Sequence, residues 1–213
     1  MYHGAWGKRL VLDGEREIER VLSFWFGELD EQGRADAAVA KRWWKKDEAF
    51  DRQIRERFEG DRSAVLAGER DGWLATPRGD LAAIIVLDQM SRNMYRDTPK
   101  MFEADGEALR MALEGIEQGV DRRLATDERA FLYLPLMHSE ELAIQKRCVQ
   151  LFSEFRDELS GELRERISRN LKFAIQHCEI IERFGRFPHR NAILGRGSTP
   201  QELAFLEQPG SSF

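Results

Sequence analysis

Three groups of polar residues interrupt the apolar stretches of this sequence, and their side chains could bind or transform a small molecule. The first group follows the apolar residues 81–87 and includes Asp88, Arg92 and Asn93. In a helix, Asp88 shares a face with Leu81, so we expect it to be buried. A buried carboxylate needs a partner, and Arg92 lies at the i, i+4 spacing that brings two helical side chains together. The two residues form either a structural ion pair that fastens the helix or a carboxylate and a guanidinium that line a pocket.

The second polar group lies in a tight corner between two predicted helices and contains His138, Ser139 and Glu140. His138 and Glu141 have the i, i+3 spacing of helical metal sites, but such a pair needs further ligands. A helix cap accounts for Ser139 and the glutamates without any metal. We therefore expect no metal here and keep His138 and Glu140 as candidate ligand-binding residues.

The third polar group surrounds Pro188, directly after the last long apolar segment, and consists of Arg186, His189, Arg190 and Asn191. Two arginines and a histidine beside the free backbone amides of a helix start would hold a carboxylate or a phosphate. The alternative is a surface loop that arginines fasten to helix carboxyl ends. Gly185 and Pro188 have a structural explanation, because glycine ends one helix and proline starts the next. The four polar residues are not needed for that change of helix. They are therefore the strongest candidates for a functional role.

The composition is that of a globular protein, with 33% charged and 42% hydrophobic residues among 213. This length suits one domain over residues 1–213. The net charge of -5 argues against a protein that binds nucleic acid, because phosphate contacts need a basic face. We therefore expect no nucleic-acid partner.

The sequence also lacks the features of a membrane or secreted protein. Its longest apolar run, residues 81–87, is far shorter than the roughly 20 residues of a membrane span. Residues 1–13 have no continuous apolar core followed by a cleavage site, and we expect them to be irregular. The sequence thus predicts a soluble, cytoplasmic protein with no membrane partner.

Neither the cysteines nor the common motifs indicate a cofactor. Cys148 and Cys178 lie among apolar residues without metal-ligand spacing, so we interpret both as reduced core cysteines. His177 precedes Cys178, but neighbours on a helix point about 100° apart, which makes a poor catalytic pair. A P-loop, a dinucleotide fingerprint, a nucleophile elbow and an HExxH motif are all absent from the sequence.

Apolar spacing predicts helices throughout the chain and no strand. Ile18, Val21, Leu22 and Trp25 fall on one helical face, and Gly27 supplies the end of that helix. Residues 82–87 are apolar on every side, so their helix should lie at the centre of the fold. Helices joined by tight turns predict an all-α domain of stacked antiparallel hairpins.

Caps and breaks predict where several helices begin and end. Thr76 and Thr199 each precede a proline and should cap a helix start. Ser139 should cap the long helix that follows it. Pro135 should kink or end its segment, and the last long helix should end near Gly185.

Four segments together resemble a bacterial family called domain-of-unknown-function family 924. The similarity runs from about Val21 to Phe205, and its segments are VLSFWFGELD, TPRGDLAAIIVLDQMSRNMYRDTP, FLYLPLMHSEELAIQ and IIERFGRFPHRNAILGRGSTPQE. The resemblance implies an all-helical superhelical bundle similar to tetratricopeptide hairpins, although the tetratricopeptide consensus is not visible. It implies no activity.

The resemblance also selects residues and shows two departures. The polar residues that fall in its motifs are Asp88, Gln89, Arg92, Asn93, His138, Ser139, Glu140, Arg186, His189, Arg190 and Asn191. Gln201 replaces an acid of the family pattern but affects only a cap. Met137 stands where relatives carry an acid, so a site that needed a carboxylate beside His138 would lack it here.

Two functions follow from these residues, and the sequence does not decide between them. The first is a binding module that holds an acidic peptide or a small anionic ligand in a groove lined by arginine and histidine. The second is a hydrolase or lyase in which His138 or His189 is the general acid or base and arginines stabilise negative charge. The enzyme hypothesis requires that His138, His189, Asp88 and Arg92 converge within hydrogen-bond reach around one cavity. A homo-oligomer would instead be favoured by exposed tryptophans gathered in one patch.

Overall fold

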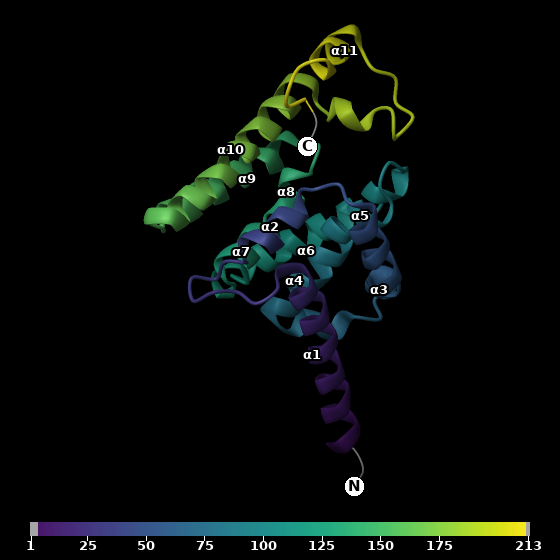
Figure 1. Ribbon diagram of the computed structural model, residues 1–213, viewed down its shortest axis with the longest axis vertical. Coiled ribbons are helices and arrows are strands. Elements are labelled where there is room, and N and C mark those ends of the chain that lie inside the picture. Colours follow the sequence, from purple (N-terminus) through teal and green to yellow (C-terminus); the bar gives the residue numbers. More distant parts are fainter. Residues whose placement is uncertain (1–3, 212–213) are drawn as a thin grey trace.

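The structure is a computed structural model that describes the backbone of residues 4–211 and the side chains of residues 14–211. The described chain is all-α, as expected, and its only pairing of strand type is an isolated bridge between Leu29 and Ala35. Figure 1 shows two long helices, α9 and α10, side by side, with α11 beyond them and a broader group of helices on the other side. The polar residues of interest come from both parts.

The first helix, α1 (Gly4–Phe26), begins earlier than the sequence suggested. We expected residues 1–13 to be irregular, and this is wrong for residues 4–13, which are helical; residues 1–3 lie outside the described residues. Residues 4–26 contain no proline that would end a helix. Once a helix has formed around Val21, each residue added towards the N-terminus needs only its own backbone to be ordered and gains one hydrogen bond, so the helix continues. Gly27 ends the helix with a φ of 68°, as predicted.

Helices α2 (Ala37–Trp43) and α3 (Glu48–Leu66) follow, each started by an aspartate. Asp36 accepts a hydrogen bond from a backbone amide of α2, and Asp47 accepts two from α3. The apolar side chains of α3, among them Phe50, Ile54 and Phe58, are buried. A short helix, η1 (Asp71–Ala75), leads from α3 to the centre of the fold.

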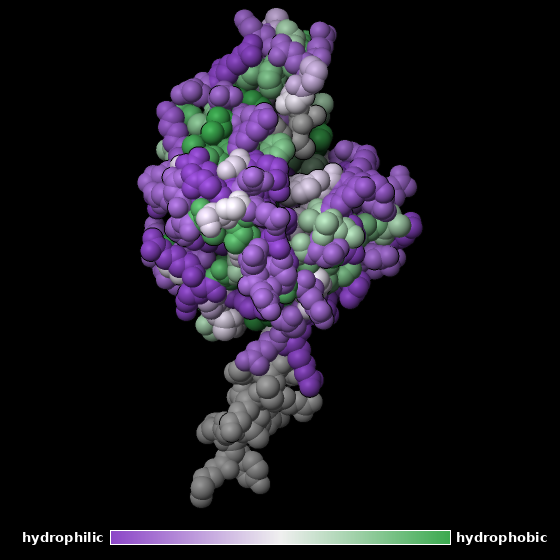
Figure 2. Space-filling view, turned by 60° about the vertical axis from the view of Figure 1, so that its left-hand side comes forward, coloured by the Kyte–Doolittle hydropathy of each residue, from purple (hydrophilic) through white to green (hydrophobic). Residues whose placement is uncertain are grey.

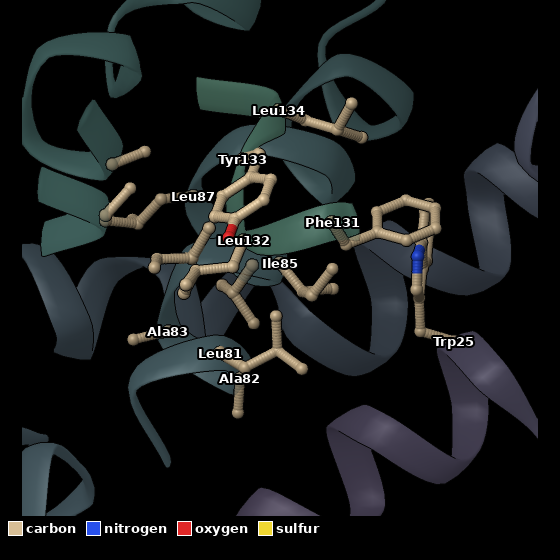
Figure 3. Packing of buried hydrophobic residues seen from close by; sticks show 14 of the residues in the cluster. Trp25, Leu81, Ala82, Ala83, Ile85, Leu87, Phe131, Leu132, Tyr133 and Leu134 are labelled. Carbon is tan, nitrogen blue, oxygen red and sulfur yellow. The ribbon is translucent and has the colours of Figure 1, made fainter. Parts of the chain in front are cut away.

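The central helix is buried on every side, as predicted, but it is not a regular α-helix. It consists of α4 (Pro77–Ile84), a π-helical turn, η2 (Ile85–Met90), and α5 (Ser91–Met94). All residues from 81 to 90 are buried, and Figure 3 shows the central apolar residues packed among Phe131–Leu134. Thr76 Oγ1 caps α4 through the amide of Gly79. π-helical turns such as η2 occur often at functional sites, and η2 contains Asp88.

The segment after the central helix is broken into short pieces. These are η3 (Pro99–Phe102), α6 (Asp105–Glu117), η4 (Asp121–Arg123), α7 (Thr126–Leu132) and α8 (Leu134–Met137). Pro135 lies in the first turn of α8, where its missing amide costs no hydrogen bond, so the predicted break is confirmed.

The C-terminal part contains a long helical hairpin, α9 (Leu142–Asp157) and α10 (Gly161–Phe184), followed by η5 (Pro188–Arg190) and α11 (Pro200–Leu206). Gly185 ends α10 with a φ of 68°, and Thr199 caps α11, as predicted. Ser139 does not cap α9. Its Oγ accepts the amide of Glu141 at 3.1 Å in a local turn, and the helix begins only after that turn.

The tetratricopeptide-like detail of the expected fold is not confirmed. The α-helices described range from the 4 residues of α8 to the 24 of α10, so they do not repeat a unit of fixed length. Helix α9, with 16 residues, and helix α10 do pack along each other as one hairpin. The helical class is therefore confirmed and the regular stacking is not.

Most apolar side chains belong to one large core around the central helix, and a small second cluster joins Ile180, Ile181 and Phe187. Cys148 is buried as expected, whereas Cys178 is only partly buried, and both are free. Trp25 and Trp73 are also buried, whereas Trp44 is exposed and its ring contacts that of the partly buried Trp43.

Hydrophilic residues dominate the face shown in Figure 2, and apolar residues are scattered over it. Across residues 4–211, every helix is too short or too polar to cross a bilayer.

Candidate functional site

A buried carboxylate and an imidazole form the centre of the candidate site. Asp88, on η2, is completely buried, and its Oδ1 lies 2.6 Å from Nδ1 of His138, which follows α8. Gln89 Nε2 donates to Asp88 Oδ2 at 2.5 Å, and Arg92 Nη2 donates to Oδ1 at 3.1 Å. A carboxylate only accepts hydrogen bonds, so the proton between the two groups is on Nδ1 of His138. Nε2 of the imidazole is then the unprotonated nitrogen when the ring is neutral.

A second carboxylate joins two arginines beside this pair. Asp105, in the first turn of α6, accepts from Arg92 Nη2 at 3.0 Å and from Arg190 Nη1 at 3.3 Å. Arg190 also donates to the carbonyl oxygen of His138 at 3.0 Å. Both guanidinium groups lie over the ring of Phe102, at 5.4 Å for Arg92 and 4.6 Å for Arg190. We call Asp88, Arg92, Asp105, His138 and Arg190 the polar cluster.

Burial decreases from the centre of the polar cluster to its edge. The side chain of Asp88 is 0% exposed and that of Arg190 is 8% exposed, whereas His138, Arg92 and Asp105 are 17%, 18% and 19% exposed. The Nε atoms of Arg92 and Arg190 are buried and have no hydrogen-bond partner among the described residues. Arg92 is thus partly accessible at the edge of the cluster, Arg190 is buried behind it, and the hydrogen-bonding capacity of both guanidinium groups is incompletely used.

The surroundings set the protonation of the central pair. Burial opposes ionisation of Asp88, but His138 and Arg92 outweigh it and hold the carboxyl pKa below its usual range. Burial and the charge of Arg92 lower the pKa of His138 below that of a free imidazole, although Asp88 acts in the opposite direction. Burial next to Arg92 also lowers the pKa of Arg190, to about 10. At neutral pH the cluster therefore contains an ionised Asp88, a neutral His138 and charged arginines.

Two further histidines lie close to the polar cluster. The ring of Phe187 is 5.5 Å from the ring of His177 on α10 and 5.5 Å from that of His189 on η5. Burial lowers the pKa of His177 to about 3 and that of His189 to about 4. Both are therefore neutral at neutral pH. His189 lies near enough to the charges of the cluster for Arg190 and Arg92 to contribute to this shift.

Three of the predicted site residues, Arg186, Asn191 and Glu140, instead fasten the C-terminal loop. Arg186 forms two hydrogen bonds with Glu202, at 2.6 and 2.8 Å, and a third with a loop carbonyl. Asn191 accepts from Arg196 and donates to the hydroxyl of Ser198. The arginines therefore hold the loop down, but through the first turn of α11 and contacts within the loop rather than through helix carboxyl ends.

Glu140 has the same role in this loop. Its carboxylate receives two hydrogen bonds from Arg196 and one from the amide of Phe187 at 2.8 Å. Glu140 thereby holds Phe187, and with it the start of η5, against the rest of the protein.

Asn93 points to another part of the molecule. Its Nδ2 donates to Asp51 on α3 at 2.7 Å, and Arg96 forms two hydrogen bonds with the same carboxylate. Asn93 thus joins α5 to α3, and these contacts do not include the polar cluster.

The predicted residues therefore separate into three sets. Asp88, Arg92, His138 and Arg190 converge, and His189 lies beside them. Hydrogen bonds join Asp88 to Arg92 and to His138, so the convergence that the enzyme hypothesis requires of four residues is met for three of them. The loop-fastening set is Glu140, Arg186 and Asn191, and Asn93 is apart.

Sequence reasoning missed Asp105, which links the two arginines. An aspartate in the first turn of a helix is common, because it faces the positive end of the helix dipole. Only the position of α6 beside α5 and η5 gives Asp105 its second role, so no local pattern distinguishes it.

A surface hollow lies elsewhere, beside α10 and α11. It measures about 620 Å³ and is lined by Arg183, Phe184, Arg186, Thr199, Gln201 and Glu202. A smaller one of about 120 Å³ lies beside α3, η1 and α6. The polar cluster borders neither, so a ligand would reach it from the edge where His138, Arg92 and Asp105 are partly exposed.

Known proteins similar to this chain identify its family. The family described as bacterial protein of unknown function (DUF924) matches residues 21–210. A solved structure of a protein of unknown function from Agrobacterium tumefaciens is 35% identical, with a TM-score of 0.73, over 95% of this chain and 99% of the other. No curated protein matches the chain. Because the family match spans most of the sequence, the chain belongs to the DUF924 family, as its motifs predicted.

Proposed function

We propose that the chain binds a small anionic molecule, through a carboxylate or phosphate group, at the polar cluster. The observation that supports this most directly is that Arg92 and Arg190 share one partly exposed carboxylate, that of Asp105. Two adjacent guanidinium groups present a planar set of donors that suits carboxylate and phosphate oxygens. In this structure Asp105 occupies those donors.

Ligand binding is then an exchange of carboxylates. The charges of Asp88 and Asp105 balance those of Arg92 and Arg190, so an added anion must take the place of one aspartate. Asp88 is fully buried, whereas Asp105 is 19% exposed at the edge of the cluster. An anion therefore displaces Asp105 and pairs with the two arginines, and Asp88 stays in place.

The small size of the accessible edge favours a small ligand over an acidic peptide. An extended peptide needs a groove along its length, and the two hollows described above do not reach the cluster. Only the partly exposed edge formed by His138, Arg92 and Asp105 is available.

Calorimetry and thermal melting with succinate and inorganic phosphate test the proposal. At least one of these probes should bind the wild-type chain and raise its melting temperature. Arg190→Gln should weaken binding about tenfold or more, because it removes a charged donor pair worth about 1.5–3 kcal/mol.

Arg96→Gln is the matched control. Arg96 follows the end of α5, four residues after Arg92, and is paired with a single aspartate, Asp51, outside the cluster. This variant should bind the probes as the wild type does. The proposal is wrong if neither probe binds, or if Arg190→Gln and Arg96→Gln bind equally well.

A further inference from the structure

We infer that His138 is a general base that activates water at the polar cluster, so that the site hydrolyses an ester of a small anionic acid. The inference rests on the proposed function, since Arg92 and Arg190 must hold the anionic end of the substrate. It is carried by the contact between Asp88 and His138, which anion binding alone does not require.

The first step of the argument is the orientation of the imidazole. Asp88 is completely buried and is held in place by Gln89 and Arg92. Its 2.6 Å contact with Nδ1 fixes both the ring and its tautomer. A carboxylate that orients a histidine in this way raises the efficiency of the other ring nitrogen as a base. In His138 that nitrogen is Nε2, which forms no hydrogen bond with the residues described.

The second step concerns the charges around the imidazole. Groups from five elements contribute to the surroundings of His138: Asp88 from η2, Arg92 from α5, Asp105 from α6, His177 from α10, and His189 and Arg190 from η5. Burial and the nearby arginine keep the ring neutral, and Asp88 stabilises the imidazolium that forms when Nε2 accepts a proton. A neutral ring beside a fixed carboxylate suits a general base at neutral pH.

The third step is the identity of the nucleophile. Ser139 is next in sequence, but its Oγ accepts the amide of Glu141 in a local turn. Cys148 is buried, and burial raises the pKa of its thiol. The side chain of His138 is 17% exposed, so water reaches it. Water is therefore the nucleophile.

In the reaction, Nε2 takes a proton from water while the water oxygen forms a bond to the ester carbonyl carbon. The bond between that carbon and the alcohol oxygen then breaks, and the leaving oxygen takes the proton back from Nε2. One water is consumed, and one acid and one alcohol are released. Arg92 and Arg190 bind a carboxylate elsewhere on the substrate.

The activity test uses the full chain with 4-nitrophenyl hydrogen succinate as the anionic ester and 4-nitrophenyl acetate as the neutral one. The wild type should hydrolyse the anionic ester with saturation and prefer it to the neutral ester about tenfold or more. Succinate should inhibit competitively, with an inhibition constant equal to its Kd from calorimetry.

His138→Asn separates catalysis from structure. The asparagine amide replaces the Nδ1 donor to Asp88 but offers no group at Nε2. The variant should bind succinate within about threefold of the wild type and lose activity about 100-fold or more. Arg96→Gln should keep full activity.

Asp88 is a positioning residue, and its test needs a readout that loss of stability would not change. Nitrogen NMR of His138 should show a proton on Nδ1 in the folded wild type and a shift towards the other tautomer in folded Asp88→Asn. Activity should fall with that shift while the melting temperature identifies any loss of fold.

Two outcomes overturn the inference and leave the proposed function intact. One is binding of succinate without protein-dependent hydrolysis of its ester. The other is full activity in folded His138→Asn. Absence of succinate and phosphate binding would instead contradict the proposed function itself.

Discussion

The buried histidine His177 makes the free energy of unfolding depend on pH. His177 is 5% exposed, and its Nδ1 donates to the carbonyl oxygen of Phe173 at 2.8 Å. Burial lowers its pKa to about 3, from about 6.5 in an unfolded chain. The unfolded state therefore binds a proton more readily than the folded state. The resulting stability is present above pH 6.5 and is lost as the pH falls towards 3.

Between pH 7 and pH 5, His177 alone should remove about 2 kcal/mol from the free energy of unfolding. His177→Asn keeps a side-chain donor near Phe173 but has no titrating group. Its unfolding free energy should fall by about 2 kcal/mol less than that of the wild type over this range. Urea unfolding at the two pH values measures the difference, and parallel pH profiles would contradict the assignment.

Asp105 gives a second prediction at the residue scale. If an anion displaces this carboxylate, Asp105→Asn should bind succinate or phosphate about tenfold more tightly, which corresponds to about 1.4 kcal/mol. A merely structural Asp105 would give weaker or unchanged binding. Calorimetry on the folded variant distinguishes these results.

At the scale of elements, the junction of η1 and α4 depends on one close backbone approach. A Cβ atom at Gly79 would lie 1.8 Å from the carbonyl oxygen of Trp73. The first turn of α4 and its cap, Thr76, therefore fit against η1 only because residue 79 has no side chain. The same turn leads directly into the buried central helix.

Gly79→Ala should lower the free energy of unfolding by about 2 kcal/mol or more, because two backbone segments must separate. Gly60→Ala is the matched control. Gly60 lies within α3 with nothing within 4 Å of an added Cβ, so alanine should be neutral or stabilising there by up to about 1 kcal/mol. Chemical unfolding of both variants tests this, and equal effects would contradict the steric argument.

At the scale of the whole molecule, the polar cluster joins two parts of the fold. Asp88, Arg92 and Asp105 come from the helices around the core, whereas Arg190 comes from the loop after α10. The contacts of Glu140 and Glu202 hold that loop in place. Arg190 therefore reaches Asp105 only while the loop is fastened.

Glu202→Gln should loosen the C-terminal loop without unfolding the core. It replaces a buried carboxylate that receives two hydrogen bonds from Arg186, at a cost of about 1–3 kcal/mol. Amide exchange should become faster over residues 186–202, stay unchanged in α3, and be accompanied by weaker succinate binding. Glu207→Gln, on an exposed residue of the same segment, should change neither. Unchanged exchange in Glu202→Gln would show that Arg186 does not hold the loop.

The sequence alone determined the helical class, the buried central helix and several helix ends. These features depend on local causes, such as the apolar residues 82–87, the positive φ of Gly27 and Gly185, and the hydroxyl caps of Thr76 and Thr199. The sequence also brought Asp88 and Arg92 together, because residues four apart meet on a helix.

Only the tertiary structure decided which polar residues share a site. His138 is 50 positions from Asp88, and Arg190 is 85 positions from Asp105, so no periodicity relates them. Arg186 and Arg190 have the same local context, yet one meets a buried glutamate and the other meets the polar cluster. Long-range packing settles this difference, because a charged side chain takes the partner that lies within its reach when the chain is folded.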